Sequence, residues 1–282
     1  MEQSALKGLL STVPLRIVGN SASGPAGPEG DLAVTPELDG WRRGNSHEHF
    51  CREAFFVISG EAVVFAGERF FRCREGTLFL VDPRELHNSC YFPGAWGLHI
   101  WMKLQSDSLL CFFYQVVTEA SKTVYSVQWS CGFEDQAVLK RINAAWDRIG
   151  QGAEDAEIEL EALFRVVFCE LYRRFDPVAD NRNGMMLHIR KFVRDTCGRG
   201  VDINYLARLA GCSRQHFMRR FRDVNGCTVG EVVEDARRGL LETVPPGTPL
   251  KETAEKLGFD SASAFCHWRK KMIRKSGGGT GE

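Results

Sequence analysis

Apolar and polar positions alternate with two different periods along this chain. Between residues 32 and 102 the apolar positions come in short runs separated by glycine-containing pairs such as Gly60-Glu61, a pattern typical of β-strands joined by tight turns. The predicted strands are Ala54–Ser59, Ala62–Ala66, Arg69–Arg72, Thr77–Val81, Tyr91–Phe92 and Gly97–Trp101. Short strands at this regular spacing predict a small β-barrel or β-sandwich.

Beyond residue 105 the period becomes helical, with apolar residues three and four positions apart. Helices are predicted at Gln105–Val117, Asp135–Ile149 and Glu154–Phe175. The apolar stripe of the first consists of Leu109, Leu110, Phe113, Val116 and Val117. The helix at Glu154–Phe175 has an apolar stripe that includes Ile158. This stripe could pack in the core of the same chain or against a second protomer.

Two polar stretches divide the chain. Gly, Pro and Ser gather at residues 19–31, and residues 176–184 contain the helix breakers Pro177 and Gly184. The expected fold class is α+β with two domains, a β-barrel with following helices and an all-α C-terminal domain. The predicted boundaries are 1–31 for an N-terminal arm and mobile loop, 32–175 for the barrel and its helices, 176–184 for the linker and 185–282 for the C-terminal domain.

The stretch Asp202–Arg222 predicts two short helices joined by a tight turn. Asp202 and Ser213 are candidate N-caps, and Gly211 suits the left-handed exit between the helices. Phe217 and Phe221 are expected on the buried side of the second helix. Two helices, a glycine turn and a basic outer face are typical of a helix-turn-helix, although a helical hairpin with a solvated charged face has the same local pattern.

A second copy of this pattern follows at residues 249–265, after a predicted helix at Val229–Leu241. Aligning the two copies pairs Ala207 with Ala254, and Phe217 with Phe265. A repeat that carries its own turn favours a duplicated helix-turn-helix.

The C-terminal part resembles the paired helix-turn-helix domain of the AraC/XylS family of transcription regulators. The residues that carry the resemblance are Leu206, Ala207, Gly211, Ser213, Phe217, Arg219, Phe221, Gly226, Arg237, Ala254, Gly258, Phe259, Ser263 and Phe265. The resemblance implies a sequence-specific regulator without enzymatic activity, which binds double-stranded DNA, responds to a small-molecule effector, acts with RNA polymerase and forms a homodimer.

The same resemblance assigns the DNA contacts. Gln215, Met218 and Arg219 lie on the side of the first recognition helix that the family uses for base contact, and Arg219 could pair with guanine. Arg214 and Arg222, at the edges, are better placed for phosphates. The remaining expected contacts are Ser213 and, on the second recognition helix, Ser263, Ala264 and His267.

Charge supports this division of the chain. Residues 182–282 contain 19 Lys+Arg against 11 Asp+Glu, a net of +8, whereas residues 1–181 have a net of −8. A basic C-terminal part is expected to bind nucleic acid, and an acidic N-terminal part is expected to be repelled by the phosphates. We expect a cytoplasmic protein for three reasons. The ten cysteines form no CxxC pair, no apolar run is long enough for a membrane span, and the sequence shows no secretion leader.

The predicted barrel contains His47-x-His49-x3-Glu53 and, further on, Pro83-x3-His87. This resembles the cupin barrel, whose metal-binding members use two His and one Glu of a first motif and one His of a second. His47, His49, Glu53 and His87 are therefore candidate ligands of a divalent metal, because imidazoles and a carboxylate suit such an ion. The alternative is that they are polar pocket walls and no cofactor is required.

Candidate ligand-binding residues are the aromatic and polar side chains expected to point into the barrel: Trp41, His47, His49, Phe55, Phe79, His87, His99 and Trp101. Such walls suit a sugar or a small aromatic compound. Two alternatives to a regulator remain at this point. One is a metal-dependent cupin enzyme with an appended nucleic-acid module, and the other is a nucleic-acid-packaging protein, which the duplicated helix-turn-helix disfavours.

Overall fold

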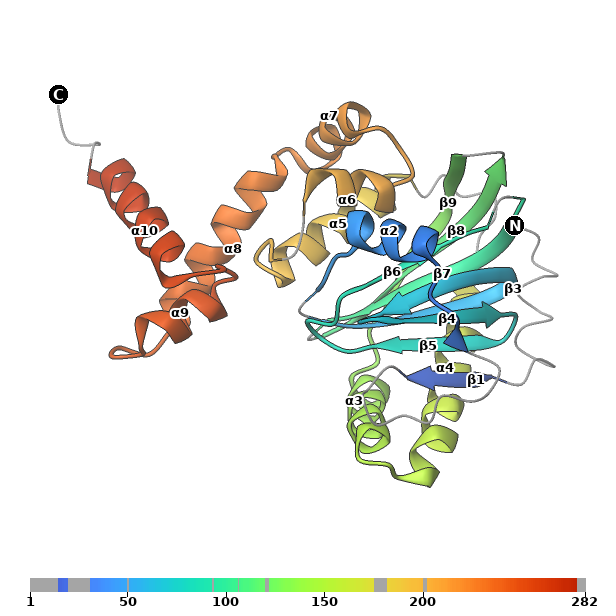
Figure 1. Cartoon of the computed structure of the whole chain (residues 1–282). Helices are drawn as coiled ribbons and strands as arrows, with labels where there is room; N and C mark the ends of the chain where they lie inside the picture. The colour runs from blue at the N-terminus through green and yellow to red at the C-terminus, as the bar shows by residue number, and fades with distance from the viewer. Residues whose placement is uncertain are drawn as a thin grey trace.

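The structure of the chain is a computed structural model that describes residues 15–19, 31–49, 51–92, 94–105, 107–119, 122–174, 182–199 and 202–277. A mixed β-sheet comes first and a set of helices follows it, as Figure 1 shows from blue to red along the chain. The predicted α+β architecture, with a β-rich N-terminal part and a helical C-terminal part, is confirmed.

The strands form one bent sheet. Their bounds are β1 (Arg16–Gly19), β2 (Asp31–Leu32), β3 (Arg52–Ala66), β4 (Arg69–Arg74), β5 (Thr77–Val81), β6 (His87–Cys90), β7 (Trp96–Leu104), β8 (Leu109–Glu119) and β9 (Lys122–Phe133). The order is β1-β5-β3-β7-β8-β9, with β4 and β6 also on β3 and β2 on β4. Only the β1–β5 pair is parallel among these pairings.

The long strand β3 corrects the prediction of two strands with a corner at Gly60-Glu61. It runs without a break from Arg52 to Ala66 and pairs with β5 and β7 in its first part and with β4 and β6 in its second. The register with β7 shifts between Val57 and Ser59. Gly60 follows with φ +78°, and a Cβ there would lie 2.0 Å from the Trp96 carbonyl oxygen, so only glycine allows this bend.

A helix that the sequence analysis missed precedes β3. Helix α2 (Pro36–Asn45) is capped by the Thr35 hydroxyl, which accepts a hydrogen bond from the Leu38 N–H at 3.3 Å. Its half-buried Trp41 packs edge-on against Phe65 at 5.6 Å between ring centroids. Helix α2 therefore covers one end of the β3–β4–β6 layer. The predicted strand at residues 91–92 is wrong, since β6 ends at Cys90.

Strand β8 corrects the helix predicted at Gln105–Val117. Alternate residues of β8 face different neighbours: Leu109, Cys111 and Phe113 pack in one core, and Leu110, Phe112, Tyr114 and Val116 pack in another. A strand that is buried on both faces is apolar at nearly every position, so it lacks the period of two that identifies a half-buried strand. That continuous apolar run is the reason for the error.

Helices α3 (Gln136–Gly150) and α4 (Glu154–Arg174) agree closely with the predicted helices at Asp135–Ile149 and Glu154–Phe175. They pack together and cover the β8 face that carries Leu109, Cys111 and Phe113 (Figure 1). The α4 residues in this core include Leu160, Phe164, Phe168 and Leu171. Ile158, predicted on the apolar stripe, is instead 72% exposed.

The C-terminal helices are α5 (Arg182–Asp195), α6 (Ile203–Leu209), α7 (Arg214–Asn225), α8 (Val229–Thr243), α9 (Leu250–Lys256) and α10 (Ala262–Gly277). The predicted linker at 176–184 ends inside the first turn of α5, and residues 175–181 lie outside the described part. Helices α5, α6 and α7 share one apolar core with the second face of β8. Helices α9 and α10 have a separate small core, and Figure 1 shows α8 leading to them away from the sheet.

Candidate functional site

The first helix-turn-helix is built from the capping residues that its sequence predicts. The Asp202 carboxylate accepts from the Tyr205 N–H at 2.8 Å and begins α6, and the Ser213 hydroxyl accepts from the His216 N–H at 3.4 Å and begins α7. Between them Gly211 takes φ +63°, the left-handed conformation that glycine allows at lowest cost. These caps and this turn are confirmed.

Helix α7 presents a polar face outward because its two phenylalanines hold the other face in the core. Phe217 and Phe221 are fully buried, four residues apart on one side. All six residues of this helix-turn-helix that the sequence analysis assigned to DNA are exposed: Ser213, Arg214, Gln215, Met218, Arg219 and Arg222. The exposed face therefore carries three arginines beside Gln215 and Met218.

The second helix-turn-helix repeats this arrangement in a weaker form. Helix α9 has Pro249 at its N-cap position and therefore no side-chain cap, whereas the Ser261 hydroxyl accepts from the Ala264 N–H at 3.1 Å at the start of α10. Phe265 is buried, and Ser263, Ala264 and His267 are exposed. The outer face that these three residues form is smaller and less basic than that of α7.

Arg237 of α8 fixes the turn of the second helix-turn-helix. Its guanidinium lies 3.9 Å from the centroid of the Phe259 ring and donates to the Leu257 and Gly258 carbonyls at 3.0 and 2.9 Å. Gly258 has φ +75°, as a tight turn requires. One arginine thus couples the long helix to the second turn.

Three histidines meet at the edge of the barrel that faces α6. His47, His49 and His87 each offer a ring nitrogen within 4.8 Å of the others, and they come from the segment before β3 and from the start of β6. The Tyr205 ring of α6 lies 5.2 Å from the His47 ring and 4.8 Å from the His49 ring between centroids. The cluster is therefore closed by a residue of the helix-turn-helix.

The cluster has the donor set for a divalent transition metal. Burial is the main reason that the pKa of His47 falls to about 3, and it also holds the pKa of His49 well below its usual value. Both imidazoles are therefore neutral at pH 7, the form that binds metals. Among the described residues, His47 Nδ1 and His49 Nδ1 are buried without a hydrogen-bond partner. His49 Nε2 and His87 Nε2 face the Glu53 carboxylate at 3.2 and 3.5 Å, and a metal would be coordinated by nitrogens of this kind.

Glu53, the fourth candidate ligand, lies beside the three histidines and is held by a lysine. Its carboxylate forms an ion pair with the ammonium of Lys103, and both side chains are 1% exposed. Burial alone would raise the pKa of the Glu53 carboxyl, but His49 and Lys103 outweigh it and hold that pKa well below its usual range. Lys103 also lies over the rings of Phe192 and Tyr205, at 4.9 and 5.3 Å, so this ion pair borders α5 and α6.

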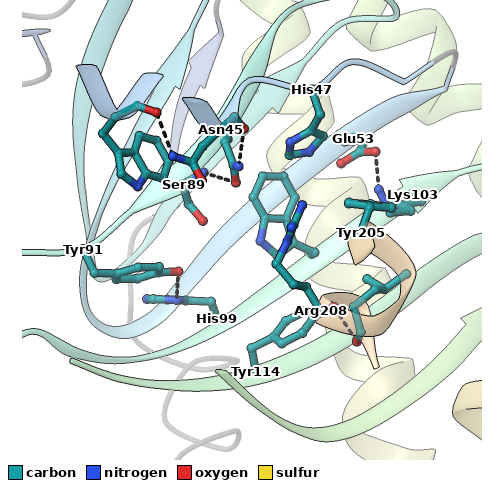
Figure 2. Close-up of a pocket in the computed structure, with 14 residues that line it drawn as sticks. Asn45, His47, Glu53, Ser89, Tyr91, His99, Lys103, Tyr114, Tyr205 and Arg208 are labelled. Atoms are coloured by element: carbon teal, nitrogen blue, oxygen red, sulfur yellow. Dashed lines mark hydrogen bonds and ion pairs between the residues drawn. The ribbon is translucent and has the colours of Figure 1, made fainter. Parts of the chain in front are cut away.

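A cavity of about 210 Å³ opens next to this cluster. Figure 2 shows its walls, which come mainly from α2, β3 and the segment before it, β6, β7, β8 and α6. Its lining residues are Trp41, Asn45, His47, Glu53, Asn88, Ser89, Tyr91, His99, Trp101, Lys103, Tyr114, Tyr205, Arg208 and Leu209.

Four of the eight candidate ligand-binding residues line this cavity: Trp41, His47, His99 and Trp101. The other four do not. Phe55 and Phe79 are buried in the barrel core behind the wall, and His49 and His87 lie in the histidine cluster. Phe55 supports the wall from behind, with its ring centroid 5.0 Å from His99 and 4.7 Å from Trp101.

The sequence analysis missed most of the polar wall. Lys103 could have been found, because His99, Trp101 and Lys103 are alternate residues of β7 and share a face. Tyr114 follows from the register, which pairs it with His99, but only once β8 is recognised as a strand. No local pattern places Tyr205, Arg208 and Leu209 here, since they belong to the other domain.

Hydrogen bonds and ion pairs join the barrel to the C-terminal helices. The Tyr114 hydroxyl donates to the Leu209 carbonyl at 3.0 Å, and Ser130 Oγ lies 2.9 Å from His188 Nδ1. The Lys191 ammonium lies 2.6 Å from Asp107 Oδ1. Arg84, a non-glycine residue with φ +67°, forms an ion pair with Glu255 of α9. The barrel therefore contacts both helix-turn-helix units.

Comparison with known proteins agrees with the geometry of the C-terminal helices. Residues 206–278 match a protein family described as a helix-turn-helix domain. The C-terminal domain is an AraC-type helix-turn-helix domain. The chain therefore contains a helix-turn-helix domain, the kind of domain whose second helix can enter the major groove of DNA.

Two relatives of the chain carry names that agree with a helix-turn-helix domain. The uncharacterized HTH-type transcriptional regulator YfiF of Bacillus subtilis (strain 168) is 22% identical over 224 residues, 76% of this chain and 71% of YfiF. The probable transcription factor PqrA of Proteus vulgaris is 34% identical over 76 residues, 26% of this chain and 61% of PqrA. The match to YfiF extends beyond the DNA-binding domain into the barrel, since it is about three times as long as the helix-turn-helix match.

Among solved structures, ToxT of Vibrio cholerae O395 matches with 12% identity over 78% of this chain and 85% of that chain. The TM-score is 0.22, which does not establish a common fold. Within the described residues, no helix has the length and apolar character that crossing a membrane requires.

Proposed function

We propose that the chain is a transcription regulator that binds a small molecule in the cavity beside α6, and that the bound molecule changes its affinity for DNA. One observation carries the proposal: the cavity wall is shared between the barrel and the first helix of the first helix-turn-helix. Tyr205, Arg208 and Leu209 come from α6, and Trp101, Lys103 and Tyr114 come from β7 and β8.

A ligand in a shared wall contacts both parts of the chain at once. It therefore stabilises the arrangement in which α6 lies against the barrel, relative to any arrangement in which α6 has moved away. Because α6 and α7 share one core, the position of α6 also sets the position of the recognition helix α7. The size of the response equals the difference in ligand affinity between the two arrangements.

The proposal is tested with a substitution that fills part of the cavity and leaves the DNA-facing side chains unchanged. Ser89→Trp would place a large ring at a buried position of β6 that lines the cavity. We expect the variant to bind DNA with unchanged sequence preference and to lose its response to the natural effector, identified by its effect on DNA affinity in fractionated cell extract. A Ser89→Trp variant that keeps the full response would refute the cavity as the effector site.

DNA recognition is proposed to rest mainly on α7, as the sequence analysis expected. Arg219 is the candidate for a bidentate contact to guanine, which is worth about 1–3 kcal/mol of discrimination. Arg219→Ala should relax preference at one base position, and His267→Ala on α10 should have a smaller effect because its face is less basic. Selection on randomised DNA measures both, and an unchanged motif for Arg219→Ala would overturn the assignment.

The homodimer and the contact with RNA polymerase are proposals of the same kind. Support for the dimer comes from α4, whose outer face exposes Ile158 and Val166 although the helix otherwise packs in the barrel core. Analytical ultracentrifugation of the full chain, with Ile158→Asp as the variant, tests whether that face joins two copies. If Ile158→Asp forms a dimer with the dissociation constant of the wild type, another surface must pair the protomers.

A second candidate function is a metal-dependent enzyme, which the histidine cluster favours. A divalent metal held by His47, His49 and His87 would act as a Lewis acid. Its neighbours argue for a structural or regulatory ion instead, because His49 and His87 are 1% exposed and Tyr205 closes the cluster. We propose that the site, if loaded, links the barrel to α6 and has no catalytic role.

Metal analysis separates these candidates. We expect His49→Gln to reduce the zinc or nickel content of the purified protein and to alter its affinity for DNA. If His49→Gln removes the metal and leaves both DNA affinity and effector response unchanged, the regulatory role is refuted.

A further inference from the structure

Charge is distributed unevenly around the cavity. The acidic and basic side chains among its lining residues are Glu53, Lys103 and Arg208. Glu53 and Lys103 form a buried ion pair and compensate each other. Arg208 is left as the uncompensated charge of the wall.

Arg208 is free to contact a ligand. It lies in the last turn of α6 and its side chain is exposed. Within the described part of the chain, its guanidinium has no ion-pair or hydrogen-bond partner, and only its backbone carbonyl is engaged, in the turn after α6. Figure 2 shows it extending from α6 into the space between Tyr114 and His47. A guanidinium presents its donors in a planar fork that matches the two oxygens of a carboxylate.

We infer that the cavity binds a small monocarboxylate with an aromatic or short apolar body, whose carboxylate pairs with Arg208. This inference rests on the proposed function, since it names the ligand class of the same site. The body of the ligand lies against the aromatic walls, which include Trp41, Tyr91, Trp101, Tyr114 and Tyr205.

The polar groups of the wall disfavour a sugar, the ligand class that the sequence suggested first. A sugar requires several hydrogen-bonding groups that are not already engaged. Among the described residues His47 Nδ1 and His99 Nε2 are such groups, but the amides and the carboxylate of the wall are held by neighbouring residues. Here the Asn45 amide donates to the Trp41 carbonyl at 2.8 Å, and the Asn88 amide donates to the Asn45 carbonyl at 2.7 Å and accepts from the Ser89 N–H at 2.8 Å. Glu53 is held by Lys103.

Size and charge narrow the class further. The cavity volume of about 210 Å³ is below the ~300–1,000 Å³ usual for ligand pockets, so the ligand is no larger than about one ring with a short side chain. One uncompensated arginine suits a single negative charge. A phosphate dianion would need a second unpaired cation, and Lys103, the other cation of the lining, is already paired with Glu53.

The position of Arg208 explains how such a ligand would act on DNA binding. The carboxylate would be held by the helix-turn-helix, and the apolar body would be held by β7 and β8 of the barrel. Removing either part of the ligand would remove one of the two attachments. The charged group therefore contributes both affinity and the link between the domains.

The test is isothermal titration calorimetry of the full chain with two matched pairs of probes, phenylacetate against phenylacetamide and hexanoate against hexanamide. Each amide keeps the shape of the acid and removes its charge. We expect at least one carboxylate to bind about 10-fold to 100-fold more tightly than its amide, since a hydrogen bond to a charged group is worth about 1.5–3 kcal/mol. Arg208→Gln should remove this preference, and Arg208→Lys should keep part of it.

Arg238→Gln is the matched control. It removes the same charge from an exposed arginine of α8 that does not line the cavity, so the preference for the carboxylate should persist. Circular dichroism and the thermal midpoint show whether each variant is folded, and Arg208→Lys keeps the test valid if Arg208→Gln is not.

The outcomes separate this inference from the proposed function. Equal affinity for acid and amide, no binding by either acid, or unchanged acid affinity in a folded Arg208 variant would overturn the carboxylate inference. Glucose binding that changes DNA affinity would overturn it while leaving the proposed function in place. Carboxylate binding that depends on Arg208 but leaves DNA affinity unchanged would support the ligand class and refute the proposed function.

Discussion

A single hydroxyl group offers a direct measure of how strongly the barrel holds the DNA-binding domain. Tyr114 of β8 is 6% exposed, and its hydroxyl donates to the carbonyl of Leu209 at 3.0 Å. Leu209 is the last residue of α6, so no backbone N–H of the same helix donates to its carbonyl. Tyr114→Phe removes this bond and keeps the ring.

The magnitude follows from what the substitution leaves behind. A neutral hydrogen bond contributes about 1 kcal/mol net, and a buried carbonyl left without its donor costs up to about 3 kcal/mol. A loss of about 1–3 kcal/mol corresponds to a change of about 5-fold to 150-fold in the equilibrium for opening of α6 from the barrel. The core that β8 shares with α5 and α6 persists, so α6 should not unfold altogether.

Amide hydrogen exchange measured by mass spectrometry reports this opening directly. In Tyr114→Phe, peptides that cover residues 203–212 should exchange about 5-fold to 150-fold faster, and peptides of α3 should keep their rates. Tyr172→Phe is the matched control, because Tyr172 packs on the opposite face of the barrel, in the core of α3 and α4. Unchanged exchange in 203–212, or an equal change in the control, would refute the claim that this bond holds α6 on the barrel.

Three further outcomes are expected. Phe217→Ala should destabilise the chain by about 3–5 kcal/mol in urea denaturation because it empties a fully buried position, whereas Met218→Ala, at an exposed position, should change stability by less than about 0.5 kcal/mol. Burial lowers the pKa of His99 to about 3, below the ~6.5 of an unfolded chain, so protonation favours unfolding below pH 6.5. The free energy of unfolding of the wild type should therefore fall by about 2 kcal/mol between pH 7 and pH 5 on account of His99. Urea titrations at both pH values should show a shallower pH dependence in His99→Gln, and an equal dependence would contradict the burial argument. Ser213→Ala should cost about 1 kcal/mol through the lost N-cap of α7, measured in the same titration, and a cost near zero would mean that the cap is not needed.

The parts of the fold that the sequence predicted are those with local signals. Asp202, Gly211 and Ser213 each act through hydrogen bonds or backbone angles within four residues, so their residue types alone identify the caps and the turn. The bend in β3 also depends on a glycine, Gly60, but the sequence pattern predicts a turn between two separate strands at this position. A glycine with a positive φ ends a strand or bends it, and only the partner strands β4 and β7 distinguish the two.

The parts that were missed depend on partners far away in the sequence. The sequence pattern predicts a helix where strand β8 lies, because the DNA-binding domain covers one face of β8 and α3 and α4 cover the other, which makes the strand apolar throughout. The cavity was incomplete for the same reason: Tyr205, Arg208 and Leu209 enter its wall only when α6 packs against β8. Both errors therefore have one cause, the burial of β8 under α5 and α6. It follows that a barrel expressed without its helix-turn-helix would expose the apolar face of β8 and would lack Arg208, so the proposed ligand site belongs to the whole chain and to neither domain alone.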